Sequence, residues 1–265
     1  QVHNLANDPR HATTLALLRE RLRDIVIGIN DLSFFPESHM VAKALDRPIT
    51  FGKSQHDKIA AHVAVADLCL QPVPKIRDRL VAALDSQDPW QRYWACIACS
   101  VSGQTARALV DNVKPLLTDT HPLVRVRAAE FLGSIRATDP MPTLYDVLNN
   151  LRTEQELMLT FNTVVFLRDF RGYPFDASRL KLKFTGGEIH RRVDYLRGAI
   201  KQSRIDYFNH QDLGYVLDVN GLKHPVRTAA DWRRRRQHIL LGLQRVMGSL
   251  PTSAQRVPLD VRTSE

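Results

Sequence analysis

The chain has 265 residues, 44% of them hydrophobic, which is ordinary for a globular protein with a substantial core. No apolar run approaches the roughly 18 residues that a membrane-spanning helix needs, so we expect no membrane span. The net charge of +9 is uneven: residues 1–180 hold 21 Lys or Arg against 20 Asp or Glu, whereas residues 181–265 hold 16 against 8. A near-neutral body with a basic tail argues against nucleic acid as a partner.

An amphipathic helix is expected from about residue 11 to residue 27. Its apolar residues, at helical spacing, are Leu15, Leu18, Leu22 and Ile25. The run N-L-A-N-D-P at residues 4–9 precedes it. This segment resembles the end of the catalytic domain of type I, formylglycine-dependent sulfatases, in which an N-L-A-x-D-P run precedes a helix patterned L-x-x-L-x-x-x-L and an Asp follows, as Asp31 does here. A plain N-capped amphipathic helix would show the same string and remains the alternative.

The resemblance assigns residues 1–37 to the end of a sulfatase-like domain. It implies that the chain, which begins with Gln and looks cut from a longer one, is the non-catalytic C-terminal portion of a bacterial sulfatase. The catalytic domain, with calcium and formylglycine, would then lie upstream and be the partner of this chain, in the periplasm or outside the cell. The sequence itself assigns no compartment.

The formylglycine motif of that family, C/S-x-P-x-R, is absent here. The run C-L-Q-P at residues 69–72 places its proline one position late and lacks the Arg. We therefore expect no catalytic, cofactor-binding or metal-ligating residue in this chain, and the sequence leaves open whether it is part of an enzyme.

Residues 38–56 are expected to form a linker that packs on the helices after it. Pro36 and Pro48 flank and interrupt this segment and are typical helix breakers. The run F-G-K-S at residues 51–54 looks superficially like a phosphate loop, but it lacks the upstream glycine of that motif, so we assign no nucleotide site.

Two matching segments, residues 84–95 and 117–128, stand 33 residues apart. The matched pairs are Leu84 with Leu117, Pro89 with Pro122, Arg92 with Arg125, and Ala95 with Ala128. A weaker third copy has Leu151 and Asn162 in the Leu and Ala positions. Each copy predicts a helix end, a turn and a second helix opened by proline, and a fixed period of this length indicates stacked helical pairs. The P-L-V-R-V-R-A run of residues 122–128 resembles HEAT repeats.

We therefore expect an all-α, HEAT-like helical-repeat solenoid over residues 57–168, with a short irregular C-terminal extension. The first helix is expected at residues 56–70, outer helices at 73–84, 105–117 and 143–151, and their partners at 89–101, 122–135 and 154–166. A solenoid of this kind offers a concave face on which a protein partner could bind.

The recurring arginines Arg92 and Arg125 have two interpretations. They could pair with acidic caps or turns such as Asp88 and Asp119 and brace adjacent repeats, which we favour because only two copies carry the Arg. The alternative is a basic groove for an anionic polysaccharide or an acidic partner.

The cysteines and histidines predict no reactive site. Cys69, Cys96 and Cys99 lie in apolar helical patterns, and the C-x-x-C spacing of the last two has no second pair, so small core residues are expected. The ten histidines show no spacing typical of a catalytic triad or a zinc site.

The period ends near residue 168. Residues 169–200 are expected to cap the solenoid, with a short strand at 180–184 and a helix at 188–200. Residues 201–265 read as a basic extension: a hairpin at 215–222 with an Asn-Gly turn, an amphipathic helix at 232–247 whose arginines at 233–236 are solvated, and a strand at 257–261.

The extension has its own resemblance. The run V-R-T-A-A-D-W at residues 226–232 and the run V-M-G-S-L-P at residues 246–251 resemble the N-terminal lead-in of bacterial α/β-hydrolases related to acetylxylan esterases. No G-x-S-x-G nucleophile elbow occurs. Three functions thus remain: a sulfatase portion that supports or presents its catalytic domain, which we favour, a protein-binding helical-repeat scaffold, and a fragment of a carbohydrate-esterase-like hydrolase.

Overall fold

The structure is a computed structural model that describes residues 4–6, 8–151, 153–184, 186–198, 212–218 and 222–247. The chain divides into two compact units, Gln1–Ile200 and Lys201–Glu265, and each is described by itself. Among the described residues, no helix combines the length and the apolar character that crossing a membrane requires.

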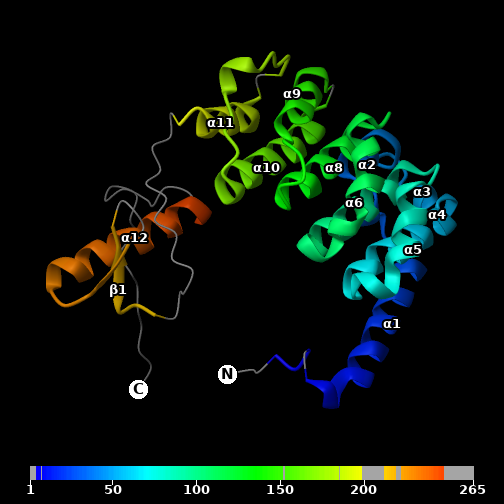
Figure 1. Cartoon of the computed structure of the whole chain (residues 1–265), viewed down its shortest axis with the longest axis horizontal. Helices are drawn as coiled ribbons and strands as arrows, with labels where there is room; N and C mark the ends of the chain where they lie inside the picture. Colours follow the sequence, from blue (N-terminus) through cyan, green and yellow to red (C-terminus); the bar gives the residue numbers. More distant parts are fainter. Residues whose placement is uncertain are drawn as a thin grey trace, which may run out of the picture. The chain divides into compact units, whose positions relative to one another are not determined.

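The first unit is built from helices joined by short turns (Figure 1). Its α-helices are α1 (Ala12–Gly28), α2 (Glu37–Lys43), α3 (Pro48–Ser54), α4 (His56–Ala66), α5 (Val73–Leu84), α6 (Pro89–Ser102), α7 (Val110–Val113), α8 (Pro122–Ser134), α9 (Met141–Asn150), α10 (Glu154–Arg171) and α11 (Gly187–Leu196). Short 3₁₀ helices are η1 (Pro9–His11), η2 (Leu32–Phe34), η3 (Asp67–Leu70), η4 (Gly103–Leu109), η5 (Lys114–Thr118) and η6 (Ala177–Arg179).

The helices stack in two layers. In one layer α4, α6, α8 and α10 pack each on the next, and α5, α7 and α9 pack beside them from the other layer. This arrangement confirms the predicted all-α helical-repeat solenoid. Ala95 of α6 and Ala128 of α8 are completely buried, and their small side chains let the two helices approach closely.

The helix starts lie where the sequence predicts them. Pro89 and Pro122 occupy the first turns of α6 and α8, where proline costs no hydrogen bond. Thr153 caps α10 by accepting a hydrogen bond from the Glu156 N–H, as in a capping box. Local signals of this kind fix the starts of the inner-layer helices.

The outer helix expected at residues 105–117 is wrong. That stretch forms η4, α7 and η5 in succession instead of one α-helix. Gly103 before it has a φ of +56°, and Pro115 lies in the first turn of η5, where it has no N–H to continue an α-helical ladder. Proline and glycine therefore divide this side of the repeat.

The segment expected to be a linker is itself helical, because Pro36 and Pro48 begin helices α2 and α3 instead of breaking them. Phe35, just before the segment, belongs to the hydrophobic core between α4, α5, α6 and α8, which we call the first core cluster, and Phe51 of α3 packs against it. The indole N–H of Trp94 donates a 2.9 Å hydrogen bond to the carbonyl of Phe34, and α2 also contacts α10. The chain thus covers part of its own inner layer.

The strand expected at residues 180–184 is also wrong, since these residues, which the structure describes, form a loop. The side chain of Asn149 binds the segment instead, accepting from the Lys181 N–H at 2.6 Å. α10 ends at Gly172, whose φ of +74° suits glycine. α11 packs on α10, where Arg168 donates to the carbonyl of Leu196 at 3.1 Å.

The second unit contains the antiparallel strands β1 (Tyr215–Leu217) and β2 (Lys223–Pro225) and the helix α12 (Ala229–Met247). α12 packs on β1. The expected Asn-Gly turn and the strand at 257–261 lie outside the described residues. Arg235 was expected in solvent with its neighbours but is 2% exposed, with its guanidinium 5.5 Å from the centre of the Tyr215 ring.

Candidate functional site

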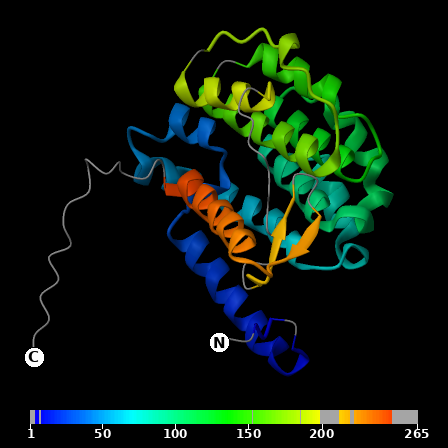
Figure 2. The ribbon, with the colours of Figure 1, turned by 90° about the vertical axis from the view of Figure 1, so that its left-hand side faces the viewer.

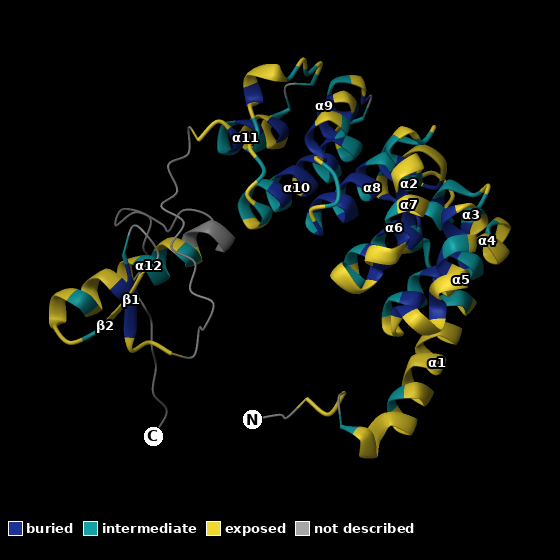
Figure 3. Cartoon of the chain, viewed as in Figure 1, coloured by how far each residue is buried: buried dark blue, intermediate teal, exposed yellow. Residues whose placement is uncertain are grey.

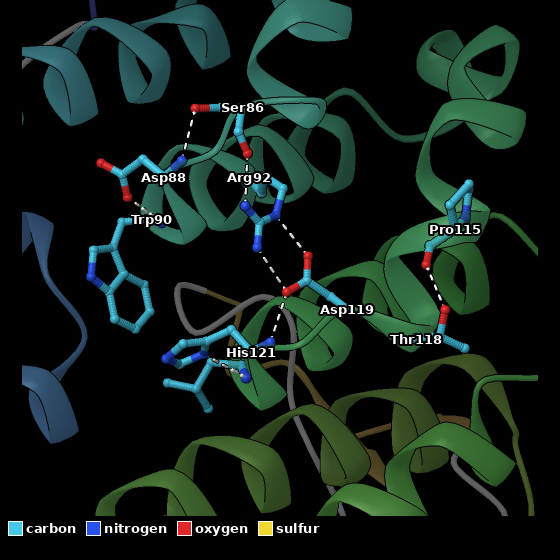
Figure 4. Close-up of polar contacts among 9 residues, drawn as sticks. Ser86, Asp88, Trp90, Arg92, Pro115, Thr118, Asp119 and His121 are labelled. Carbon is cyan, nitrogen blue, oxygen red and sulfur yellow. Dashed lines mark hydrogen bonds and ion pairs between the residues drawn. The ribbon is translucent and has the colours of Figure 1, made fainter.

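Asp88 joins two elements at the start of α6. One carboxylate oxygen accepts from the Trp90 N–H at 2.8 Å and thereby caps the helix, as Figure 4 shows. The other lies 2.7 Å from Nε2 of His62, a completely buried residue of α4. Burial works to raise the pKa of Asp88, but the hydrogen bonds from His62 and Trp90 outweigh it, and the net pKa is lowered. Each carboxylate oxygen of Asp88 therefore has a hydrogen-bond partner within the fold.

Arg92 binds the following repeat. Its Nε and Nη2 donate to the two carboxylate oxygens of Asp119 at 2.6 and 2.9 Å, and its Nη1 donates to the Ser86 carbonyl at 2.7 Å (Figure 4). Asp119 also accepts from the His121 N–H at 2.7 Å, at the start of α8. The hydrogen bonds that Arg92 donates to Asp119 raise the pKa of the guanidinium further.

The second recurring arginine, Arg125, donates to the Leu117 carbonyl at 3.1 Å and pairs with Asp146 of α9. Both arginines thus brace neighbouring elements, as the structural interpretation predicted. The expected partner Asp88 is bound by His62 instead. Because both guanidinium groups already have carboxylate partners, the structure favours the bracing interpretation over a basic groove at these two residues.

A cavity of about 540 Å³ opens beside Trp90, between the connecting helices α2 and α3 and the start of α6. We call it the aromatic cavity. It is lined by Phe35, His39, Lys43, Phe51, Gln55, Lys58, Gln87, Asp88, Pro89 and Trp90. Cavities of this size are typical of binding sites for side chains and small molecules.

The rings of the aromatic cavity hold one another in place. His39 stacks on Phe35 at 4.9 Å between centroids and meets the edge of Trp90 at 5.2 Å. Phe35 also contacts Phe51 at 5.8 Å. On its other side Trp90 contacts His121 at 4.4 Å, which ties the cavity to the next repeat. The aromatic walls of the cavity are therefore preformed.

The charge of the aromatic cavity is positive. Lys43 and Lys58 are exposed and make no ion pair among the residues that the structure describes. Burial lowers the pKa of His39, and the charge of Lys43 lowers it further, so this ring is neutral at neutral pH. Asp88 is the acidic residue in the lining, and its oxygens are already bound by His62 and the Trp90 N–H.

A second surface lies on α1, which extends away from the stacked helices in Figures 1 and 2. Leu18, Leu22 and Ile25 of α1, and Ile29 just after its last residue, are 56%, 61%, 59% and 66% exposed. They and the half-exposed Leu15 follow one another at alternating spacings of three and four. We call these five residues the α1 stripe. The exposure of α1 is visible in Figure 3.

The cysteines lie away from both surfaces. Cys96 and Cys99 are completely buried, as expected for core residues. Burial raises the pKa of the Cys96 thiol well above its usual value and that of Cys99 to about 12. Within the described part of the chain, no three His, Cys, Asp or Glu side chains are arranged to hold a metal ion.

Comparison with known proteins assigns the class of the repeat region. The family described as HEAT repeats matches residues 78–154, from within α5 to the first residue of α10. This match fits the HEAT-like helical-repeat fold of the stacked helices. No curated protein and no solved structure matches the chain, so the sulfatase and esterase resemblances find no support there.

Sequence reasoning did not single out His39, Lys43, Lys58 or His62. Their neighbours in the fold come from the start of α6, tens of residues away, and no local pattern announces the contact. The Asp-Pro-Trp run was noticed only as a helix start. The sequence predicts four of the five residues of the α1 stripe as one apolar face of a helix, all but Ile29, and it does not predict that this face is exposed.

Proposed function

We propose that this protein is a protein-binding helical-repeat scaffold. The observation that carries the proposal is the exposure of the α1 stripe. Helical-repeat proteins use extended rigid surfaces to bind other proteins. A continuous apolar surface on a folded protein marks a site of interaction, whereas single exposed apolar residues need no explanation.

The α1 stripe runs along the exposed length of the helix. At the C-terminal end of α1, Val26 and Ile27 pack against the first core cluster, and α1 contacts α4. The stripe residues follow the three-four spacing of a helix seam, which presents a narrow apolar ridge to a partner. The C-terminal end of α1 therefore anchors the helix, while the stripe is available for binding.

The concave-face alternative is weaker at this end of the solenoid. The segment that carries Phe34, Phe35 and α2 already covers α6 and reaches α10. A partner would have to displace it, whereas the α1 stripe needs no rearrangement. We therefore place the main contact on α1.

Site-specific photo-crosslinking in the natural host tests the proposal. A photoreactive phenylalanine analogue replaces Leu22, and the same analogue at Glu20, which is exposed on another side of α1, is the matched control. We expect the analogue at position 22 to cross-link to a single partner protein, and the analogue at position 20 to give no cross-link. Equal cross-linking from both positions, or a cross-link only to a second copy of the chain, would contradict it.

The second candidate is the portion of a sulfatase that supports its catalytic domain. The observation in its favour is that the α1 stripe lies within the segment that resembles the end of that domain. In this case the cross-link from position 22 joins two parts of one polypeptide. A cross-link to a separate protein favours the protein-binding scaffold instead.

A further inference from the structure

The aromatic cavity has a different character from the α1 stripe, because it combines ring walls with a net positive charge. Its cations come from two elements: Lys43 lies in the last turn of α2 and Lys58 in the first turn of α4. Both are exposed at a cavity whose inner surface is formed by Phe35, Phe51 and Trp90.

We infer that the aromatic cavity binds a carboxylate carried next to an aromatic or branched apolar group, supplied by an acidic segment of the partner protein. The apolar group would occupy the space against Trp90 and Phe51, and the carboxylate would lie between Lys43 and Lys58. The inference rests on the proposed function only in naming the partner protein as the source.

The cavity lining explains why the ligand is an anion. Asp88 offsets only one of the two lysine charges, because it carries a single negative charge. His39 makes no side-chain hydrogen bond among the described residues and can donate one from its neutral ring. A ligand carboxylate would meet two ammonium groups and this donor.

A phosphate group fits the cavity less well. The N–H of Trp90, at the start of α6, would be the natural donor to a phosphate, but Asp88 already occupies it. A phosphate dianion would also approach the charge of Asp88, and no arginine lines the cavity to bind it in bidentate fashion. A singly charged carboxylate meets the same lysines with less repulsion.

Calorimetric titration of the whole chain with two matched peptides tests the inference. The first is acetyl-Gly-Glu-Phe-Glu-Gly-amide, and the second replaces both glutamates by glutamine. We expect the acidic peptide to bind about tenfold more tightly at low ionic strength, as two exposed charge pairs would give, and the difference to shrink in added salt.

The variant Lys43→Gln with Lys58→Gln should remove the difference between the peptides. The control variant Lys75→Gln with Lys181→Gln removes the same charge from exposed residues that do not line the cavity, and should keep the difference. Circular dichroism checks that both variants fold. Equal binding of the two peptides, or equal loss in both variants, would overturn the inference.

Phenylacetate serves as the free-acid probe. Weaker binding of phenylacetate than of the acidic peptide supports a protein segment as the source, and tighter binding overturns that assignment in favour of a small organic acid. Failure of the peptide-binding test can be distinguished from failure of the proposed function, because the two tests use different surfaces. Cross-linking from Leu22 should be unchanged in the Lys43→Gln, Lys58→Gln variant if α1 binds independently.

Discussion

The guanidinium of Arg92 binds both carboxylate oxygens of Asp119 in the following repeat, at 2.6 and 2.9 Å. The side chains are 13% and 4% exposed, so the pair is shielded from water. Removing one partner leaves the other charge buried without compensation. We expect Arg92→Gln to lower the free energy of unfolding by about 3 kcal/mol, measured by urea denaturation.

The matched control is Arg125→Gln. Its partner Asp146 is 52% exposed, so solvent already screens that pair, and the loss should be below about 1 kcal/mol. In a double-mutant cycle, Asp119→Asn should cost much less in the Arg92→Gln background than in the wild type. Equal losses for the two arginines would show that shielding does not decide the strength of these braces.

Asp88 supports a second prediction, because it both caps α6 and binds His62. Asp88→Ala removes the cap and leaves the buried His62 ring without its partner, since Nδ1 of that ring has no partner among the described residues. We expect a loss of about 3 kcal/mol. Asp88→Asn keeps a capping oxygen and should lose clearly less. A loss as large for asparagine as for alanine would mean that the charge matters more than the cap.

Local signals explain what the sequence could predict and what it could not. Pro89 and Pro122 mark helix starts within a few residues, so the starts of α6 and α8 were predicted correctly. The end of α10 was not, because the helix continues to Arg171 instead of ending at residue 166. Pro115 is a local signal for a helix break, but the apolar pattern of residues 105–117 favours one continuous helix, and the prediction followed that pattern. The contact of His39 with Trp90 spans two elements with no shared pattern, so the aromatic cavity could be found only from the fold.

Stability should depend on pH through His39 and His121. Burial lowers the pKa of both rings in the folded chain, whereas in the unfolded chain it is about 6.5. Their contribution is therefore complete above about pH 6.5 and is lost as the pH falls towards the lowered folded pKa, because the unfolded chain then binds protons that the folded chain does not.

Urea unfolding at several pH values between about 7.5 and 5 measures this dependence. The variant His39→Gln with His121→Gln should show a shallower decline of the free energy of unfolding than the wild type. Asp88 stays ionised throughout this range because its pKa is lowered. An unchanged slope in the double variant would assign the dependence to other groups.

The cysteines should be almost unreactive in the folded protein. Cys96 and Cys99 are completely buried with raised thiol pKa values, and burial also raises the pKa of Cys69. A disulfide reagent at neutral pH should label Cys69 slowly and the other two only after unfolding in urea, when all three thiols react. Cys69→Ser identifies the first thiol to react. Rapid labelling of Cys96 and Cys99, or zinc retained by the purified chain, would contradict their assignment as core residues.

The α1 stripe should contribute to binding without contributing to folding. Leu22 is 61% exposed, so Leu22→Glu removes little buried apolar surface and should change the free energy of unfolding by less than about 0.5 kcal/mol. Leu80 is completely buried in the core, and Leu80→Ala should cost about 2 to 5 kcal/mol. Urea denaturation compares the two, and cross-linking from Ile25 in the Leu22→Glu background measures binding.

If Leu22→Glu destabilises the chain as strongly as Leu80→Ala, the stripe is part of the core and not a surface for a partner. If the chain stays stable while the cross-link is lost, folding and binding are separate properties of α1.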